Sequence, residues 1–119
     1  MQWMFLTPAL LALSLQAQPL AKTLNELKAF YAANCVKCHG TDGSALGPEG
    51  KKLGGLDFTD AKKLAKESDA GLVKTIRKGV MFGIVMPAFK DKLTEEEMLL
   101  LVNEILRKAE KGKVIAPQP

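Results

Sequence analysis

Residues 35–39 of this 119-residue chain read Cys-Val-Lys-Cys-His, and His39 is its only histidine. Two thiols three positions apart, followed directly by an imidazole, form the CxxCH pattern that is typical of covalent c-type haem attachment. Cys35 and Cys38 can form thioethers with the two vinyl groups of one porphyrin, while His39 binds its iron from one face. The pattern therefore predicts one covalently bound haem c per chain, and a fold that wraps around a flat macrocycle.

The same cysteines allow other interpretations: a thioredoxin-like dithiol, a structural disulfide, or part of a zinc site. A thioredoxin-like dithiol is expected in a βαβ unit, yet no alternating strand pattern precedes Cys35. A closed zinc site needs four ligands, whereas the chain offers two cysteines and one histidine, with Cys38 and His39 adjacent. These interpretations fit the chain less well than covalent haem.

Residues 1–21 have the features of a secretory signal peptide, with an apolar core at residues 3–15 and cleavage after Ala17 or Ala21. No lysine or arginine precedes the core, which departs from the usual pattern. The apolar stretch is short for a membrane span, so an uncleaved anchor is the weaker alternative. The segment predicts export to the periplasm and no integral membrane span in the mature protein.

The chain after the leader has the size of one small domain. We place this domain at residues 22–112 and expect a disordered tail at residues 113–119, which ends in Pro-Gln-Pro. No internal repeat and no pair of strand-like segments is apparent. The predicted fold class is therefore all-α, with three to five short helices.

Local signals place these helices along the chain. A capping box at Thr23–Glu26 predicts a helix over residues 24–34 that runs into the CxxCH motif. A second capping box at Thr94–Glu97 begins the final helix, which Gly112 is expected to end. Two shorter helices are expected between them, at residues 60–66 with Thr59 or Asp60 as cap, and from Ser68 or Asp69 to about Gly79.

Every charged side chain lies after Ala21, with 17 lysines and arginines against 13 aspartates and glutamates. These charges predict a positive face that steers toward redox partners with acidic docking surfaces, and a merely solvated helix surface is the alternative. No aromatic residues interleave with the lysines, which argues against nucleic-acid binding. The lysines of the middle third are Lys51, Lys52, Lys62, Lys63, Lys66, Lys74 and Lys78.

A second axial ligand is needed if the iron face opposite His39 is closed, and the histidine count excludes another imidazole. The candidates after the leader are Met81, Met86 and Met98, with a lysine amine as a weaker choice. Met98 falls on the apolar face of a helix, where a methionine usually fills the core. Met86 precedes Pro87, which restricts its backbone and stiffens the loop. Met86 is therefore favoured, with Met81 next.

These features, in this order, make the chain resemble the class I c-type cytochromes, which are small exported proteins with one haem. The resemblance covers nearly all of the chain after the leader. It rests on Tyr31 four residues before the first cysteine, Cys35-Val36-Lys37-Cys38-His39-Gly40, Gly47-Pro48, Asp57-Phe58-Thr59, Gly79, Met86-Pro87-Ala88-Phe89 and Leu93-Thr94.

The resemblance implies the cytochrome c fold, with short helices wrapped around one haem, and axial ligation by His39 and Met86. It implies that the Pro48 carbonyl accepts a hydrogen bond from the imidazole nitrogen that faces away from the iron. It also implies that the first and last helices cross. Family members usually place a glycine on the first helix and an aromatic residue on the last at this crossing, where this chain has Leu27 and Glu104. We therefore expect a larger separation or a shifted register there.

A haem iron held by imidazole and thioether has no open site, which predicts a non-enzymatic one-electron carrier between two redox partners. The sequence shows no arrangement of acid–base or nucleophilic residues for another chemistry. Two alternatives stay open. One is a gas-binding or peroxide-reactive haem protein with a labile sixth position, and the other is a haem subunit of a dehydrogenase or oxidase complex.

Overall fold

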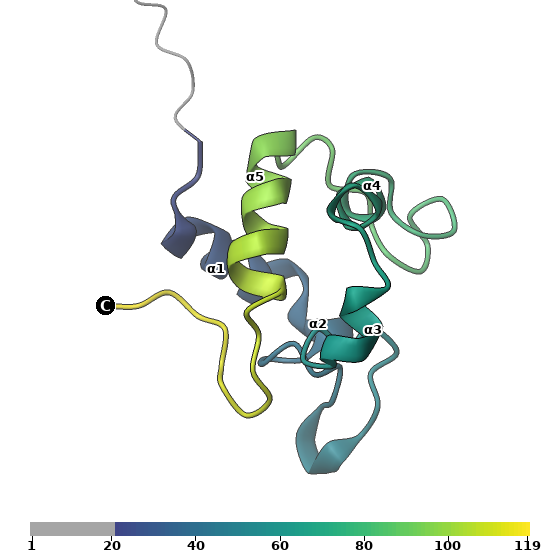
Figure 1. Ribbon diagram of the computed structural model, residues 1–119, viewed down its shortest axis with the longest axis vertical. Helices are drawn as coiled ribbons and strands as arrows, with labels where there is room; N and C mark the ends of the chain where they lie inside the picture. Colours follow the sequence, from purple (N-terminus) through teal and green to yellow (C-terminus); the bar gives the residue numbers. More distant parts are fainter. Residues whose placement is uncertain (1–20) are drawn as a thin grey trace, which may run out of the picture.

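The computed structural model describes residues 21–119, so the predicted leader lies outside the described residues except for Ala21. No β-strand is present in residues 21–119, only two isolated bridges, which confirms the all-α prediction. No helix in this part of the chain is long and apolar enough to cross a membrane. The helices are α1 (Leu24–Asn34), α2 (Val36–His39), α3 (Ala61–Ala65), α4 (Asp69–Lys78) and α5 (Glu95–Leu101) (Figure 1).

Helix α1 spans the predicted residues because Thr23 and Glu26 form the expected capping box. The Thr23 hydroxyl accepts the Glu26 N–H at 3.2 Å, and the Glu26 carboxylate accepts the Thr23 N–H at 3.2 Å. At the other end, the Cys35 N–H donates to the Tyr31 carbonyl at 2.9 Å, and α2 follows immediately. Both cysteines and the histidine therefore lie on one short run of helical backbone.

The capping residues of the two middle helices are also as predicted. Asp60 accepts the N–H groups of Lys62 and Lys63 at the start of α3, and Ser68 accepts the Gly71 N–H at the start of α4. One guanidinium ties these helices to the end of the last one. Arg107 donates to Asp69 at 2.7 Å, to the Leu64 carbonyl at 3.2 Å and to the Glu67 carbonyl at 2.8 Å.

The final helix begins as predicted, but the prediction that it continues to Gly112 is wrong. Helix α5 ends at Leu101, and the backbone then widens into a π-helical turn, η2 (Val102–Leu106). The wider turn leaves two consecutive side chains buried, Ile105 and Leu106, as a regular helix with one apolar face would not require. The local stop signal at Gly112 could not predict the π-helical turn, because that turn coincides with buried packing contacts.

The core lies where α1 and α4 pack against α5. Figure 1 shows α5 standing across α1, as the resemblance implied. Leu27 of α1 and Val102 of η2 are both fully buried, so aliphatic side chains fill this region. Glu104, which takes the position expected for an aromatic residue, does not enter the core. Its carboxylate is 40% exposed and pairs with the Lys108 ammonium at 2.7 Å.

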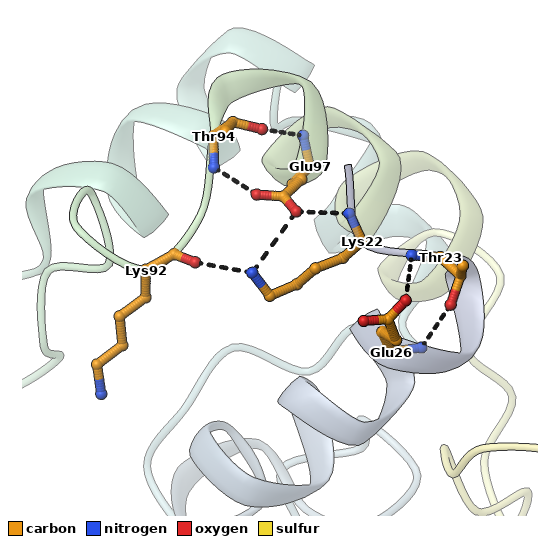
Figure 2. Close-up of polar contacts among 6 residues, drawn as sticks. All are labelled: Lys22, Thr23, Glu26, Lys92, Thr94 and Glu97. Atoms are coloured by element: carbon orange, nitrogen blue, oxygen red, sulfur yellow. Dashed lines mark hydrogen bonds and ion pairs between the residues drawn. The ribbon is translucent and has the colours of Figure 1, made fainter. Parts of the chain in front are cut away.

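The residues just before α1 are tied to the start of α5 (Figure 2). Glu97 is 5% exposed, and its carboxylate accepts the Thr94 N–H at 2.8 Å and the Lys22 N–H at 2.7 Å. The Lys22 ammonium lies 3.6 Å from the same carboxylate and donates to the Lys92 carbonyl at 3.2 Å. Burial alone would raise the pKa of Glu97, but these hydrogen bonds and the Lys22 charge bring it below its ordinary value.

Residues 113–119, expected to be disordered, lie against the domain instead. Ile115 is buried, and its N–H donates to the Thr41 carbonyl at 2.8 Å. The Asn25 side chain accepts the Gln118 N–H at 3.1 Å and donates to the Gln118 carbonyl at 3.0 Å. The composition of the tail suggested disorder, but its partners are distant in sequence and could not be read from it.

Candidate haem site

The two cysteines and the histidine of the CxxCH motif line an apolar cavity of about 460 Å³. Cys35, Cys38 and His39 reach it from the first two helices, and Met86 and Pro87 reach it from the loop after α4. The volume falls within the range of roughly 300–1,000 Å³ found for cofactor pockets. The structure thus brings four of the predicted site residues around one space. The other lining residues are Asn34, Leu53, Gly54, Gly55, Leu56, Thr75, Val80, Val85 and Phe89.

Neither cysteine forms a disulfide, and both are half-buried. Burial, helped by the charge of Cys38, raises the pKa of the Cys35 thiol to about 12. A thiol is nucleophilic only as the thiolate, and redox-active dithiols lower this pKa. The surroundings of Cys35 are therefore unsuited to a thioredoxin-like dithiol, whereas they suit a side chain tethered within an apolar cavity.

The imidazole of His39 is held in one orientation. Its Nδ1 lies 3.0 Å from the Leu56 carbonyl oxygen, and because a carbonyl only accepts, Nδ1 carries the proton. Nε2 then has the free lone pair that a metal requires. Phe58 stacks on the ring with 4.6 Å between ring centroids and 22° between planes. Burial lowers the pKa of His39 by more than the Leu56 hydrogen bond raises it, so the imidazole stays neutral at pH 7.

The Pro48 carbonyl is not the partner of this imidazole, so that expectation from the resemblance is wrong. Pro48 is exposed and begins the tight turn η1 (Pro48–Gly50). Further along the same loop, the Gly55 N–H donates to the Cys38 carbonyl at 2.9 Å. This bond brings the next carbonyl, that of Leu56, to Nδ1 of the histidine.

Gly55 is required here because its backbone lies against the histidine. A Cβ at this position would run into the Cys38 carbonyl oxygen and lie 2.7 Å from Nδ1 of His39. Neither Gly55 nor the Leu56 carbonyl is among the residues predicted for the site. The consecutive glycines at 54 and 55 are a usable signal of close backbone approach. A backbone carbonyl has no such signal, since every residue carries one.

Tyr31 stabilises the His39 side of the cavity. It is fully buried, and its hydroxyl donates to the Gly40 carbonyl at 2.7 Å. Gly40 ends α2 with a φ of +81°, a conformation that favours glycine. The tyrosine therefore fixes the point at which the chain leaves the CxxCH motif.

The structure separates the three candidate methionines. Met98 is 1% exposed within the helical core, and Met81 is 64% exposed; neither lines the cavity. Met86 is partly buried, packs against the core and lines the cavity that His39 also lines. The Val80 N–H donates to the Met86 carbonyl at 2.9 Å, which closes the loop that carries this methionine.

These residues fit a covalently bound haem. Two thiols, an imidazole with Nε2 free and a thioether sulfur border one cavity with a mainly apolar lining. Within the described part of the chain, no group of three His, Cys, Asp or Glu side chains is placed to hold a metal ion. The donor set is the one found in c-type haem proteins.

Comparison with known proteins identifies the family. The family model described as "Cytochrome C oxidase, cbb3-type, subunit III" matches residues 22–103, which is more than half of the chain. The chain belongs to the class I c-type cytochromes. Cytochrome c6 of Synechocystis sp. is 32% identical to this cytochrome over 99 residues, which cover 83% of the chain and 77% of the relative. Cytochrome c6 of Microcystis aeruginosa is 33% identical over 82 residues, which cover 69% of the chain and 93% of the relative.

Solved structures of c-type cytochromes have the same fold. The c-type cytochrome KustC0563 is 37% identical with a TM-score of 0.57, over 71% of this chain and 96% of that one. The c-type cytochrome NirC is 22% identical with a TM-score of 0.52, over 68% of this chain and 85% of that one. This similarity supports the fold alone. The predicted cytochrome c fold is confirmed. This cytochrome carries one covalently bound haem c and is a monohaem electron carrier.

Proposed function

We propose that this cytochrome is a periplasmic one-electron carrier whose iron is held between Nε2 of His39 and the sulfur of Met86. The observation that carries the proposal is that these two side chains line one cavity together with Cys35 and Cys38. A bound haem supplies a reversible one-electron change of its iron. The two cysteines would hold it as thioether tethers.

The residues around the cavity suit electron transfer without further chemistry. The Leu56 carbonyl keeps His39 in the tautomer that a ligand needs, and burial lowers the pKa of His39, which favours the neutral imidazole. Pro87 restricts the backbone of Met86 and so stiffens the loop that carries the sulfur. A soft thioether ligand and an apolar lining both favour the reduced state of a haem iron. We propose no catalytic role for the protein.

Location and partners follow from the charged surface and the leader. The predicted signal peptide supports export, although its residues lie almost entirely outside the structure. Brief encounters with acidic donor and acceptor proteins would suit a carrier of this kind. The lysines that support them are all exposed: Lys51, Lys52, Lys62, Lys63, Lys66, Lys74 and Lys78.

Absorption spectra of the exported protein test the ligand set. The ferric form should show the weak red band of methionine-ligated haem, and the reduced form should bind carbon monoxide slowly or not at all. Met86→Leu keeps the apolar volume without the sulfur ligand, so it should abolish the band and open the iron to carbon monoxide. Met81→Leu is the matched control and should change neither property, because Met81 is exposed and outside the cavity.

Two results would contradict the proposal. Retention of the red band in Met86→Leu would remove Met86 from the ligand set. Rapid carbon monoxide binding by the unmodified reduced protein would favour the gas-binding or peroxide-reactive alternative with a labile sixth position.

A second candidate is a haem subunit of an oxidase complex, which the description of the matched family favours. The two candidates differ in whether the protein diffuses alone. Gel filtration of a native extract should elute a free carrier at the size of the monomer. Elution of all the covalent haem of this chain with a larger complex would instead support the subunit.

A further inference from the structure

The loop between α4 and α5 stands out from the helices (Figure 1). It exposes large apolar side chains. At its tip, Phe82 is 102% exposed and Ile84 is 85% exposed. No charged residue occurs between Gly79 and Phe89. An exposed apolar group of this kind on a small domain marks a contact surface. The apolar residues exposed on it are Val80, Met81, Phe82, Ile84 and Val85.

The haem accounts for only part of this apolar surface. Val80 and Val85 line the haem cavity, so they face the bound group. Met81, Phe82 and Ile84 do not line it. These three side chains therefore lie outside the haem cavity and are exposed on the surface of the loop.

The loop holds its tip in a fixed shape. Its ends are joined by hydrogen bonds from the Val80 N–H to the Met86 carbonyl at 2.9 Å and from the Val85 N–H to the Val80 carbonyl at 3.2 Å. Met81 and Phe82 both have left-handed backbone, with φ values of +54° and +56°. Such a conformation is unfavourable for these residue types and persists only where the surrounding structure enforces it. The result is a convex, pre-formed apolar knob.

Cationic side chains flank the base of this knob. Lys74 and Lys78 lie one turn apart on α4, and Lys90 is brought beside that helix because the Phe89 N–H donates to the Ile76 carbonyl at 2.9 Å. In residues 21–119 none of these three lysines forms an ion pair. Of the neighbouring acids, Glu95 is paired with Arg77 and Asp91 follows Lys90, so the positive charges are in excess.

We propose that residues 80–85 dock this cytochrome on an anionic lipid bilayer, with Phe82 and Ile84 in the interface and Lys74, Lys78 and Lys90 at the lipid phosphates. An apolar tip above a group of cationic side chains is typical of interfacial membrane binding. A bilayer accepts a convex knob without a matching pocket, which a protein partner would have to provide. The docking site goes beyond the proposed electron transfer, because it would keep the carrier near membrane-bound partners.

Vesicle flotation of the haem-loaded protein tests this proposal. The protein should float with vesicles of phosphatidylcholine and phosphatidylglycerol in equal parts, and much less with phosphatidylcholine alone. Added salt should weaken binding to the mixed vesicles. The double variant Phe82→Asn, Ile84→Ser should weaken binding by about tenfold or more. Asparagine suits the left-handed backbone at position 82, and both side chains are exposed, so the fold is preserved.

The control is Val114→Ser, which removes an exposed apolar side chain from the C-terminal segment and should leave binding unchanged. Lys78→Gln should reduce binding to the mixed vesicles by about fivefold. No flotation with anionic vesicles at low salt would overturn the proposal, as would equal binding by the double variant, which would show attraction by lysines alone. The red band of each variant reports ligation separately, so failure of docking and failure of Met86 ligation remain distinguishable.

Discussion

The two sides of the haem cavity are built differently. On the His39 side, the imidazole is fixed by a backbone carbonyl and a stacked ring, and the buried Tyr31 holds the carbonyl of the next residue, Gly40. On the Met86 side, the proposed ligand lies at the closed base of a loop whose tip is almost entirely exposed. The first arrangement resists change because a hydrogen bond and a ring contact would be lost together. The second depends on the geometry of one short loop.

On each side of the cavity, a glycine allows close approach of the backbone. Gly55 allows close approach to His39, and Gly79 allows the chain to pass the carbonyl of Met86. An added methyl group at either position would displace the backbone that carries or holds one of the two proposed ligands. The two positions therefore allow each side to be disturbed separately, which tests whether they are independent.

Gly79→Ala should have the largest effect. Its Cβ would run into the Met86 carbonyl oxygen and lie 2.9 Å from the Ala88 nitrogen, and its φ is +73°. Overpacking together with left-handed backbone should lower the free energy of unfolding by about 3–4 kcal/mol. Chemical denaturation of the haem-loaded protein measures this loss, and the red band should disappear with it.

The matched control for this change is Gly83→Ala in the same loop, which has a positive φ but open space around it. It should cost only about 1–2 kcal/mol and keep the band. If both variants lose the band equally, loop conformation rather than contact with Met86 governs the sulfur.

Gly55→Ala should be the next largest change. A methyl group there would break the bonds by which the loop holds Cys38 and His39, at a cost of about 2 kcal/mol. The reduction potential should shift because the imidazole loses the Leu56 carbonyl, while the methionine band should remain. A variant with an unchanged potential would show that the Leu56 carbonyl does not tune the iron.

Glu97→Gln is a remote change that disturbs neither side of the cavity, so it serves as a reference for the comparison of the two sides. Loss of a charged acceptor for Lys22 and Thr94 should cost roughly 1–2 kcal/mol at pH 7 without altering the spectrum. Because the pKa of Glu97 is lowered in the folded protein, its charge stabilises the fold above the ordinary value of 4.5. The difference between the two proteins should therefore shrink as the pH falls below that value. Unfolding curves over a pH series measure it, and a constant difference would argue against the carboxylate charge.

Tyr31→Phe should give the smallest effect, about 1 kcal/mol, because one buried hydrogen bond to the Gly40 carbonyl is lost. The Met86 side should be unaffected. Combining this change with Glu97→Gln should give an additive loss in thermal or chemical unfolding, since the two share no hydrogen-bond partner. A non-additive result would show that the two regions are coupled through α1.

Local chemistry explains what the sequence could predict. The capping boxes fixed the starts of α1 and α5, and the pair Met86-Pro87 pointed to the methionine that shares the cavity with His39. Contacts between distant segments explain the rest. The Leu56 carbonyl, the π-helical turn after Leu101 and the ordered tail all depend on partners that no neighbouring residue indicates.

The hydrogen bonds between the two ends of the domain have a consequence for how the protein is made. Lys22 and Asn25, at the amino end, take their partners from Glu97 and Gln118. A chain that emerges amino end first exposes its first helix and the thiol of Cys35 long before those partners exist. There is therefore an interval, set by the length of the chain, in which a cofactor can be attached covalently to that thiol before the closing contacts form.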